Sequence, residues 1–267
     1  MTAVAFRKFV LNADDFGMDE GVDAAVLDLA SRGVVTAASA MVLSPRWTEA
    51  SKALAKAPLS KGLHLDFTSP FATGRAEECS ITAFVMRAYS QRLNRHQLRS
   101  SIQRQLGLYE DVMGAAPEFV DGHRHVHQLP IIRQELINCL LNRYVGGIKV
   151  RICTPKRWRG VEAAMVGFSG ARALRRLAEA LSRGTNTDFC GVYSFGRNAN
   201  LPRLWRRWLE GASGSLPLIM CHPASSLPAQ PKLPDPIRQA RLREYDWLKS
   251  DDFRELCMEI RMVPAQW

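Results

Sequence analysis

Short apolar segments rich in β-branched residues alternate along the whole chain with longer segments of helical pattern. This alternation limits the fold more than any other feature, because it is typical of parallel strands that are each followed by a helix. The expected strands span residues 8–12, 34–43, 61–67, 117–123, 147–153, 188–194, 215–221 and 259–263. The expected helices span residues 19–32, 45–56, 80–93, 96–113, 129–143, 160–183, 200–210 and 236–256. Eight such units predict an α/β fold of the (β/α) barrel type.

The length of the chain agrees with one barrel and leaves little for a second unit. A barrel of this type fills roughly 200 to 300 residues, and the chain has 267. Its apolar fraction of 46% supplies the material for a buried core. We therefore expect a single domain over residues 1–267.

The N-terminal segment and the cysteines indicate the cytoplasm. Arg7 and Lys8 interrupt the first apolar stretch, so it does not match the apolar region of a secretory signal. No run approaches the roughly 20 apolar residues that span a bilayer. The six cysteines form no CxxC pair and are expected to be reduced thiols.

Arginines account for most of the net charge of +10. They cluster within expected helices and no phosphate-binding glycine-rich loop accompanies them, so we expect solvated helix faces and no nucleic-acid partner. Peripheral contact with an anionic or lipid-linked substrate stays open, as does a homodimer. The clusters are Arg172/Arg175/Arg176, Arg203/Arg206/Arg207 and Arg238/Arg241/Arg243. The proline-rich segment 223–236 is expected to form a long loop over one end of the barrel.

Polar residues collect where the expected strands end. They include Asp14 and Asp15, His64, Arg151 and His222. Five of the six histidines lie at these ends, and only His96 lies inside a helical segment. Because barrel enzymes build their active sites at the carboxyl ends of the strands, this distribution predicts an active site there.

The segment FVDGHRHVHQLP places Asp121, His123, His125 and His127 at alternate positions. In extended backbone these side chains would share one face, with His123 and His127 about 13 Å apart at roughly 3.3 Å per residue. At most two neighbours could then bind one metal ion. His123 is the best candidate because it ends the strand, and the others are expected to orient groups, contact substrate or cap the next helix.

Asp14 and Asp15 are adjacent carboxylates, whose repulsion a bound cation would relieve. One can bind the metal while its neighbour acts as a general base. Asp19 is better placed to cap the following helix. Two histidines and one carboxylate are typical of hydrolytic zinc sites and also of non-haem iron oxygenases, and Mg, Mn, Ni or Co stay open.

Several motifs in this order resemble the YdjC-like carbohydrate deacetylase family, which includes chitooligosaccharide deacetylases and hopanoid-biosynthesis-associated members. They are VLNADDFGMDEGVDAAVLDLASRGVVTAASAMV, KGLHLDFT, FVDGHRHVHQLP, DFCGVYSF and LPLIMCHPA. The resemblance implies a deformed TIM-like barrel, a divalent metal ion, and hydrolysis that removes the N-acetyl group from an amino sugar. The family commonly has glycine after the His-Pro pair, where this chain has Ala224.

The resemblance also assigns roles to residues. It implies Asp15, His64 and His123 as metal ligands, Asp14 as the catalytic base and His222 as an acid. Arg151 could pair with Asp14 or contact substrate. Alternatives remain: a barrel metallohydrolase for another amide, ester or phosphoester, an iron oxygenase, or a metal-binding module without catalysis.

Overall fold

All eight expected strands are present in the computed structural model, which describes residues 5–75, 79–227 and 234–267. Most are shorter than expected, because residues at one or both of their ends belong to the flanking turns, loops or helices. Their bounds are β1 (Arg7–Phe16), β2 (Ala37–Ala40), β3 (Ser60–Leu65), β4 (Phe119–Gly122), β5 (Lys149–Val150), β6 (Phe189–Cys190), β7 (Leu218–Cys221) and β8 (Met262–Pro264).

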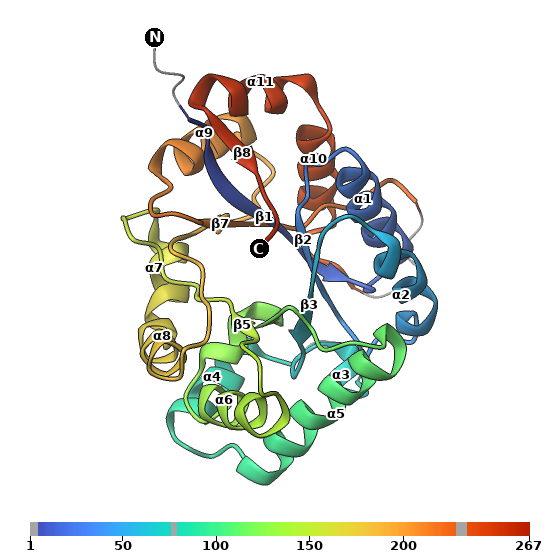
Figure 1. The fold of residues 1–267 in the computed structure, drawn as a ribbon, viewed down its shortest axis with the longest axis vertical. Coiled ribbons are helices and arrows are strands. Elements are labelled where there is room, and N and C mark those ends of the chain that lie inside the picture. The colour runs from blue at the N-terminus through green and yellow to red at the C-terminus, as the bar shows by residue number, and fades with distance from the viewer. Residues whose placement is uncertain (1–4, 76–78, 228–233) are drawn as a thin grey trace.

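The strands form one parallel sheet that curls into a deformed barrel, with helices around its outside (Figure 1). Seven strands follow the order β5-β4-β3-β2-β1-β7-β6. The eighth, β8, pairs only with residues 7–9 of β1, while residues 10–13 of β1 pair with β7. The carboxyl ends of β1 and β7 are therefore direct neighbours, which confirms the deformed TIM-like barrel and brings the loops after these strands together.

The helices follow the expected positions, except that two expected helices are split and the short helices α3 and η1 were not expected. Their bounds are α1 (Glu20–Ser31), α2 (Trp47–Lys56), α3 (Pro70–Thr73), α4 (Ile81–Tyr89), α5 (Arg95–Met113), η1 (His123–Gln128), α6 (Ile132–Arg143), α7 (Val161–Phe168), α8 (Ala171–Ala180), α9 (Leu201–Gly211), α10 (Arg238–Leu248) and α11 (Asp251–Ile260). Asp19 caps α1 as expected, since its Oδ1 accepts a hydrogen bond from the Val22 N–H at 2.9 Å.

Two helices that we expected to be continuous are each broken in two. The segment 160–183 breaks at Gly170, where φ is +119° and a Cβ would collide with the carbonyl oxygen of Gln128. The segment 236–256 breaks at Ser250, whose hydroxyl accepts a hydrogen bond from the Phe253 N–H and starts α11. The short helix α3, which was not expected, begins in the same way at Ser69.

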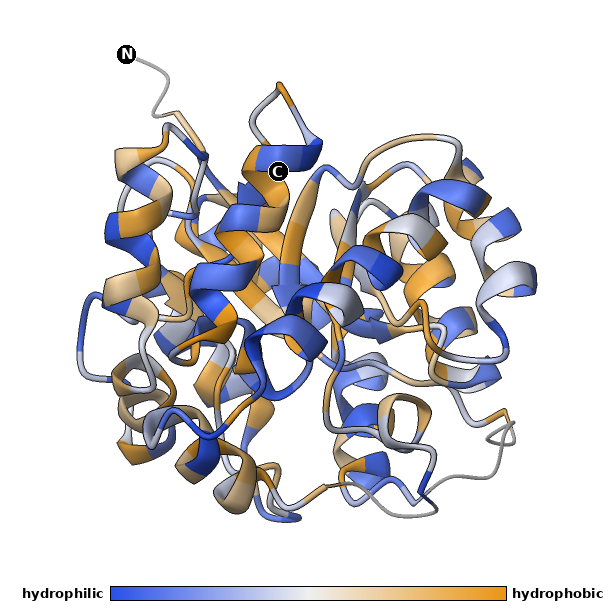
Figure 2. Ribbon diagram, turned by 90° about the horizontal axis from the view of Figure 1, so that it is seen from below, coloured by the Kyte–Doolittle hydropathy of each residue, from blue (hydrophilic) through white to orange (hydrophobic). Residues whose placement is uncertain are grey.

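The strands are buried on both faces, as expected where helices cover a parallel sheet. Residues 9–16 of β1 are all buried. Figure 2 shows apolar strands at the centre and helices whose polar sides face outward. None of the helices in the described part of the chain is long and apolar enough to cross a membrane.

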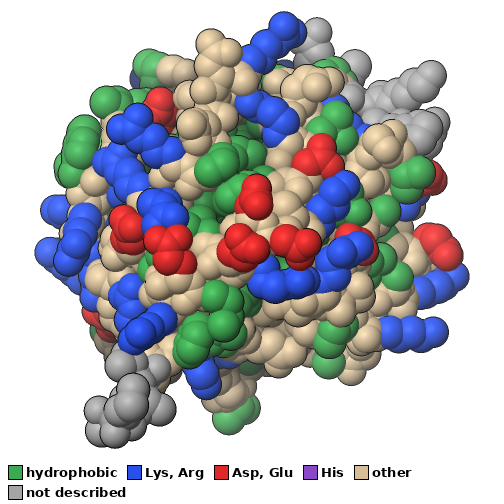
Figure 3. All heavy atoms as spheres, turned by 90° about the horizontal axis from the view of Figure 1, so that it is seen from above, with side chains coloured by type: hydrophobic (Ala, Val, Ile, Leu, Met, Phe, Trp, Pro, Cys, Tyr) green, Lys and Arg blue, Asp and Glu red, His purple; other side chains and the backbone are tan. Residues whose placement is uncertain are grey.

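On the face over α9, α10 and α11, acidic and basic side chains lie side by side (Figure 3). Arg206, for example, pairs with Glu259 at 2.6 Å, and both are exposed. Such solvated pairs agree with the expectation for the cluster around Arg206. They also explain why a high net charge does not produce a uniformly positive surface here.

Candidate active site

A β-bulge at the end of β1 brings two adjacent carboxylates to one cavity. The register of β1 against β2 shifts between Ala13 and Phe16, and Asp15 has a positive φ of 67°. In a regular strand neighbouring side chains point to opposite faces, and a bulge changes that direction. As a result, Asp14 and Asp15 both line a cavity of about 340 Å³ at the carboxyl ends of the strands.

Asp15, His64 and His123 converge in this cavity from β1, β3 and the residue that follows β4. Asp15 Oδ1 lies 3.2 Å from His64 Nε2 and 3.1 Å from His123 Nδ1. The three ligand atoms lie within 4.8 Å of one another. Ligands of a tetrahedral site with bonds near 2 Å are separated by about 3.3 Å. These side chains are therefore spaced to hold one divalent ion.

The second ring nitrogen of His64 is held by a carboxylate. Its Nδ1–H donates to Asp121 Oδ1 at 2.6 Å, which leaves Nε2 facing Asp15. Burial lowers the pKa of His64, but Asp121 and Asp15 outweigh it and raise the pKa to about 9. The position between Asp15 and His64 thus attracts positive charge. A carboxylate behind a ligating histidine is the usual support of a metal site.

Asp14, His64 and Asp121 form a second group with suitable spacing. Here, however, the Arg151 guanidinium already engages both carboxylates, at 2.6 Å from Asp14 Oδ1 and 3.0 Å from Asp121 Oδ2. Its fixed charge would oppose a cation. The group that contains Asp15 and His123 is therefore the better candidate for a cation site.

Asp14 is held as a buried, ionised carboxylate. Arg151 binds both of its oxygens, at 2.6 and 3.0 Å, and Asn12 Nδ2 donates to it at 2.7 Å. Burial would raise the pKa of Asp14, but the charges of Arg151, His64 and His222 outweigh burial and hold the pKa below its ordinary value. Asp14 therefore stays charged at neutral pH.

The histidine run does not continue as a strand, so our expectation of an extended segment was wrong. The chain turns at Gly122 into η1, in which Arg124 and His125 both have positive φ, at 52° and 59°. The turn is tight: a Cβ at Gly122 would lie 3.1 Å from the His127 side chain. Alternate residues consequently do not share one face.

Each histidine of the run has its own surroundings. His123 belongs to the group with Asp15 and His64, whereas His125 lines the cavity with its Nδ1 at 3.5 Å from Cys153 Sγ. His127 is fully buried and its Nε2–H donates to the Arg151 carbonyl at 2.9 Å. Burial, helped by the Arg151 charge, lowers the pKa of His127 to about 4. His127 is therefore a neutral residue that fixes the loop and does not line the cavity.

His222 enters the cavity from the end of β7. Its Nε2 lies 3.9 Å from Asp14 Oδ2, and the Phe195 ring packs edge-on against it with 5.2 Å between centroids. The backbone N–H of His222 donates to Glu244 at 2.6 Å, and Glu244 also accepts a hydrogen bond from the Tyr193 hydroxyl at 2.6 Å. The imidazole thus projects from a fixed backbone.

A model of the family described as "YdjC-like protein" matches residues 8–259. The chain belongs to this family. Human carbohydrate deacetylase is 27% identical to this YdjC-like protein over 248 residues, which cover 81% of this chain and 74% of the human protein. A chitooligosaccharide deacetylase of Yersinia pestis (strain Pestoides F) is 30% identical over 134 residues. That match covers 47% of this chain and about half, 53%, of the Yersinia enzyme.

A crystal structure from Enterococcus faecalis V583 has the same fold as this YdjC-like protein. It is provisionally named a cellobiose-phosphate cleavage protein, and it is 21% identical with a TM-score of 0.71 over 98% of each chain. At this level of identity the likeness shows the fold alone.

The sequence did not reveal the role of Arg241 in this YdjC-like protein. Its Nη2 donates to Asp15 Oδ2 at 2.7 Å and its Nε donates to Asp235 at 3.0 Å. The expectation of a solvated face was therefore wrong for this part of α10, where Arg238 likewise pairs with Asp19 at 3.1 Å. The one signal in the sequence was the position of Arg241, because α10 follows the loop that begins at His222, directly after β7.

The expected loop over one end of the barrel is described in part. Residues 228–233 of the proline-rich segment lie outside the described residues. Its last residues, Pro234, Asp235 and Pro236, line the cavity. Ala224, where the family commonly has glycine, is buried, and its N–H donates to the carbonyl of Arg241 at 3.2 Å.

Proposed function

We propose that this protein is a metal-dependent hydrolase that removes the N-acetyl group from an acetylated amino sugar. The observation that carries the proposal is the convergence of Asp15, His64 and His123 beside the ionised Asp14 on one cavity. The names of the human and Yersinia relatives support the reaction and the substrate class.

Asp15, His64 and His123 would hold the ion, since their nitrogen and oxygen donors suit Zn²⁺ and related divalent metals. A divalent ion bound there supplies a Lewis acid that polarises the acetyl carbonyl and lowers the pKa of water, so that a weak base suffices for catalysis. Arg241 neutralises the Asp15 oxygen that faces away from the histidines. Asp15 is thereby directed through Oδ1 toward the ligand set.

Asp14 is the proposed general base. Its position beside Asp15 keeps it within reach of the same cavity, and its lowered pKa keeps it in the ionised form from which a carboxylate can accept a proton. Arg151 is a positioning residue that fixes both Asp14 oxygens. The proton then has a defined acceptor in an otherwise buried site.

His222 is the proposed acid for the departing amine. It lines the same cavity as Asp14, and its Nε2 lies 3.9 Å from Asp14 Oδ2. His222 would donate a proton to the amine as the carbon–nitrogen bond breaks. His125, which lines the cavity but joins neither group, is proposed to contact substrate.

The cavity volume of about 340 Å³ is at the small end of ligand sites. We therefore propose that one acetamido sugar residue enters, while the remainder of an oligosaccharide or glycolipid stays outside. The free state of all six cysteines supports a reducing compartment, and we propose the cytoplasm.

The test is acetate release from a panel of N-acetylglucosamine, its short β-linked oligomers and a lipid-linked N-acetylglucosaminide, with product masses measured in parallel. We expect the loss of one acetyl group from at least one member and no loss with Asp14→Asn. If the metal-loaded protein leaves every acetamide intact but cleaves an ester or a phosphoester, the proposed reaction is wrong.

A further inference from the structure

Large apolar side chains gather on the outer surface of α4, of α7 and of the loop before α7. Trp158, Met165 and Phe168 have 67–72% of their surface exposed. The full set, which we call the apolar rim, comprises Met86, Tyr89, Trp158, Val161, Met165 and Phe168. Such a concentration on a folded protein marks a surface that contacts something else.

The parts of the apolar rim are held together by the fold. Val161, Met165 and Phe168 follow helical spacing and lie on one side of α7. The hydroxyl of Tyr89 on α4 donates to the carbonyl of Phe168 at 3.3 Å. These contacts place the ends of α4 and α7 side by side as one surface.

The apolar rim borders the active-site cavity. Ile81 of α4 and Val166 of α7 line that cavity, whereas Met86 and Met165 on the same helices are exposed to solvent. The two helices therefore separate the active site from the outer surface that carries the rim. The apolar rim thus lies on the outer sides of two helices whose other sides contribute residues to the cavity lining.

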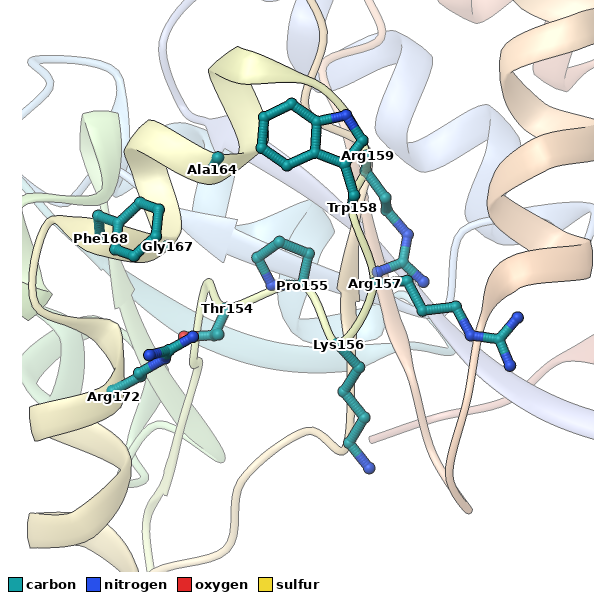
Figure 4. A pocket seen from close by; sticks show the side chains of 10 residues that line it. All are labelled: Thr154, Pro155, Lys156, Arg157, Trp158, Arg159, Ala164, Gly167, Phe168 and Arg172. Carbon is teal, nitrogen blue, oxygen red and sulfur yellow. The ribbon is translucent and has the colours of Figure 1, made fainter.

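Basic side chains surround the apolar rim. Apart from Arg159, which is buried and pairs with Asp188, residues 81–89 and 154–172 contain four basic residues and one acidic residue, Glu162. Lys156, Arg157 and Arg172 line a hollow of about 230 Å³ together with Trp158 and Phe168 (Figure 4). Within the described residues, none of these three cations forms an ion pair with a carboxylate. Their charge is therefore available to a negative partner.

Close packing between α7 and the loop before it supports the hollow. A Cβ at Gly167 would lie 3.1 Å from Pro155, so the loop and α7 are in close contact. The Arg172 guanidinium lies over the Phe168 ring, 5.7 Å from its centroid. Figure 4 shows the rings of Trp158 and Phe168 at two ends of this hollow. Aromatic and basic groups are thus presented together on a supported surface.

We propose that the apolar rim is a docking surface for a lipid bilayer that carries anionic headgroups. Tryptophan and tyrosine favour the boundary between headgroups and acyl chains, and nearby lysine and arginine are attracted to anionic lipids. A second copy of the chain is a poorer occupant, because a two-fold interface would set the same cations against each other. The proposal concerns this surface and does not depend on the reaction at the metal site.

Vesicle binding tests the proposal with the full-length protein. Among the described residues, Trp158 is the only exposed tryptophan, so a change in tryptophan fluorescence that depends on it reports on contact with lipid. With phosphatidylcholine–phosphatidylglycerol vesicles we expect a blue shift, quenching by brominated lipid, and weakening by salt. Trp158→Phe should still co-sediment with the vesicles but lose the spectral change.

Substitutions then locate the surface. We expect Phe168→Ser and Arg172→Glu each to weaken vesicle binding about tenfold or more. The matched control is Met258→Ser on α11, a 60% exposed apolar residue distant in sequence, which should bind as the unmodified protein does. Acetate release from a soluble sugar should be the same in all of these variants, which separates this test from that of the reaction.

Three results would overturn the proposal. One is the absence of binding to anionic vesicles at low salt. Another is equal weakening by Met258→Ser, which would mean that the rim has no special role. The third is a dimer in sedimentation experiments that Phe168→Ser dissociates, because a second copy would then occupy the rim.

Discussion

Replacing Asp121 with asparagine isolates the contribution of a carboxylate that contacts a proposed metal ligand, His64, but is not itself proposed as one. Asp121 Oδ1 accepts the Nδ1–H of His64 at 2.6 Å, and its Oδ2 lies 3.0 Å from Arg151 Nη1. An asparagine can still accept one hydrogen bond. Its amide NH2 must then face either the His64 Nδ1–H or Arg151, both of which are donors.

The expected magnitude follows from the burial of this group. His64 and Asp121 are at most 1% exposed, so water cannot replace the lost acceptor. The substitution also removes the negative charge that makes His64 a stronger ligand. Loss of such a supporting carboxylate typically weakens metal binding 10- to 100-fold, equivalent to about 1.4 to 2.7 kcal/mol.

The assay is zinc affinity, measured by competition with a chromophoric chelator at fixed pH and ionic strength. Asp188→Asn is the matched control, because Asp188 is a fully buried carboxylate that pairs with Arg159 at 2.7 Å and binds no proposed ligand. Circular dichroism would establish that both variants are folded. Unchanged zinc affinity in folded Asp121→Asn would refute the assigned role, and an equal loss in the control would trace the effect to the fold.

Three further outcomes are expected. Asp15→Ala should lose bound metal in elemental analysis, whereas Asp14→Asn should keep the metal and lose turnover; activity retained in the second variant would contradict the base assignment. His127→Ala should keep its metal but lower the free energy of unfolding by about 1 to 3 kcal/mol in denaturant titrations, since the buried Arg151 carbonyl loses its donor. The third concerns acid stability. Burial raises the pKa of Asp188, but hydrogen bonds and the Arg159 charge lower it overall. Asp188 therefore binds a proton more tightly in the unfolded chain than in the folded one. The stability that ionised Asp188 contributes is present above its unfolded pKa and is lost as the pH falls through its folded pKa. Denaturation curves of Asp188→Asn should depend less steeply on pH in the acid range, and an unchanged slope would contradict this.

The position of the site could be predicted because it follows from topology. Residues after the carboxyl ends of parallel strands meet at one edge, so Asp15, His64 and His123 had to come close together once the strands were placed. That inference needs only approximate strand positions. It was therefore insensitive to the errors in strand length.

The directions of the side chains could not be predicted in the same way. The alternation that places His123, His125 and His127 on one face assumes extended backbone, but this chain turns at Gly122. Two consecutive residues with positive φ that are not glycine are held by contacts around them, and such contacts do not appear in local sequence.

Arg241 shows a second limit of the sequence. An arginine beside other arginines on a helix has the same local pattern whether it faces water or a buried carboxylate. Only the packing of α10 against the end of β1 distinguishes these cases, and the two residues are separated by 226 positions in the chain.

The bulge at Asp14 and Asp15 has a consequence for anyone who would transfer this chemistry to another protein. In a regular strand only every second side chain points toward a given site. Two cooperating carboxylates would therefore ordinarily need two strands or a spacer residue between them. Here one backbone irregularity lets consecutive residues serve different tasks, one toward the ligand set and one toward Arg151. Copying the dipeptide into a regular strand would direct one carboxylate into the helix layer. The backbone shape therefore has to be transplanted along with the residues.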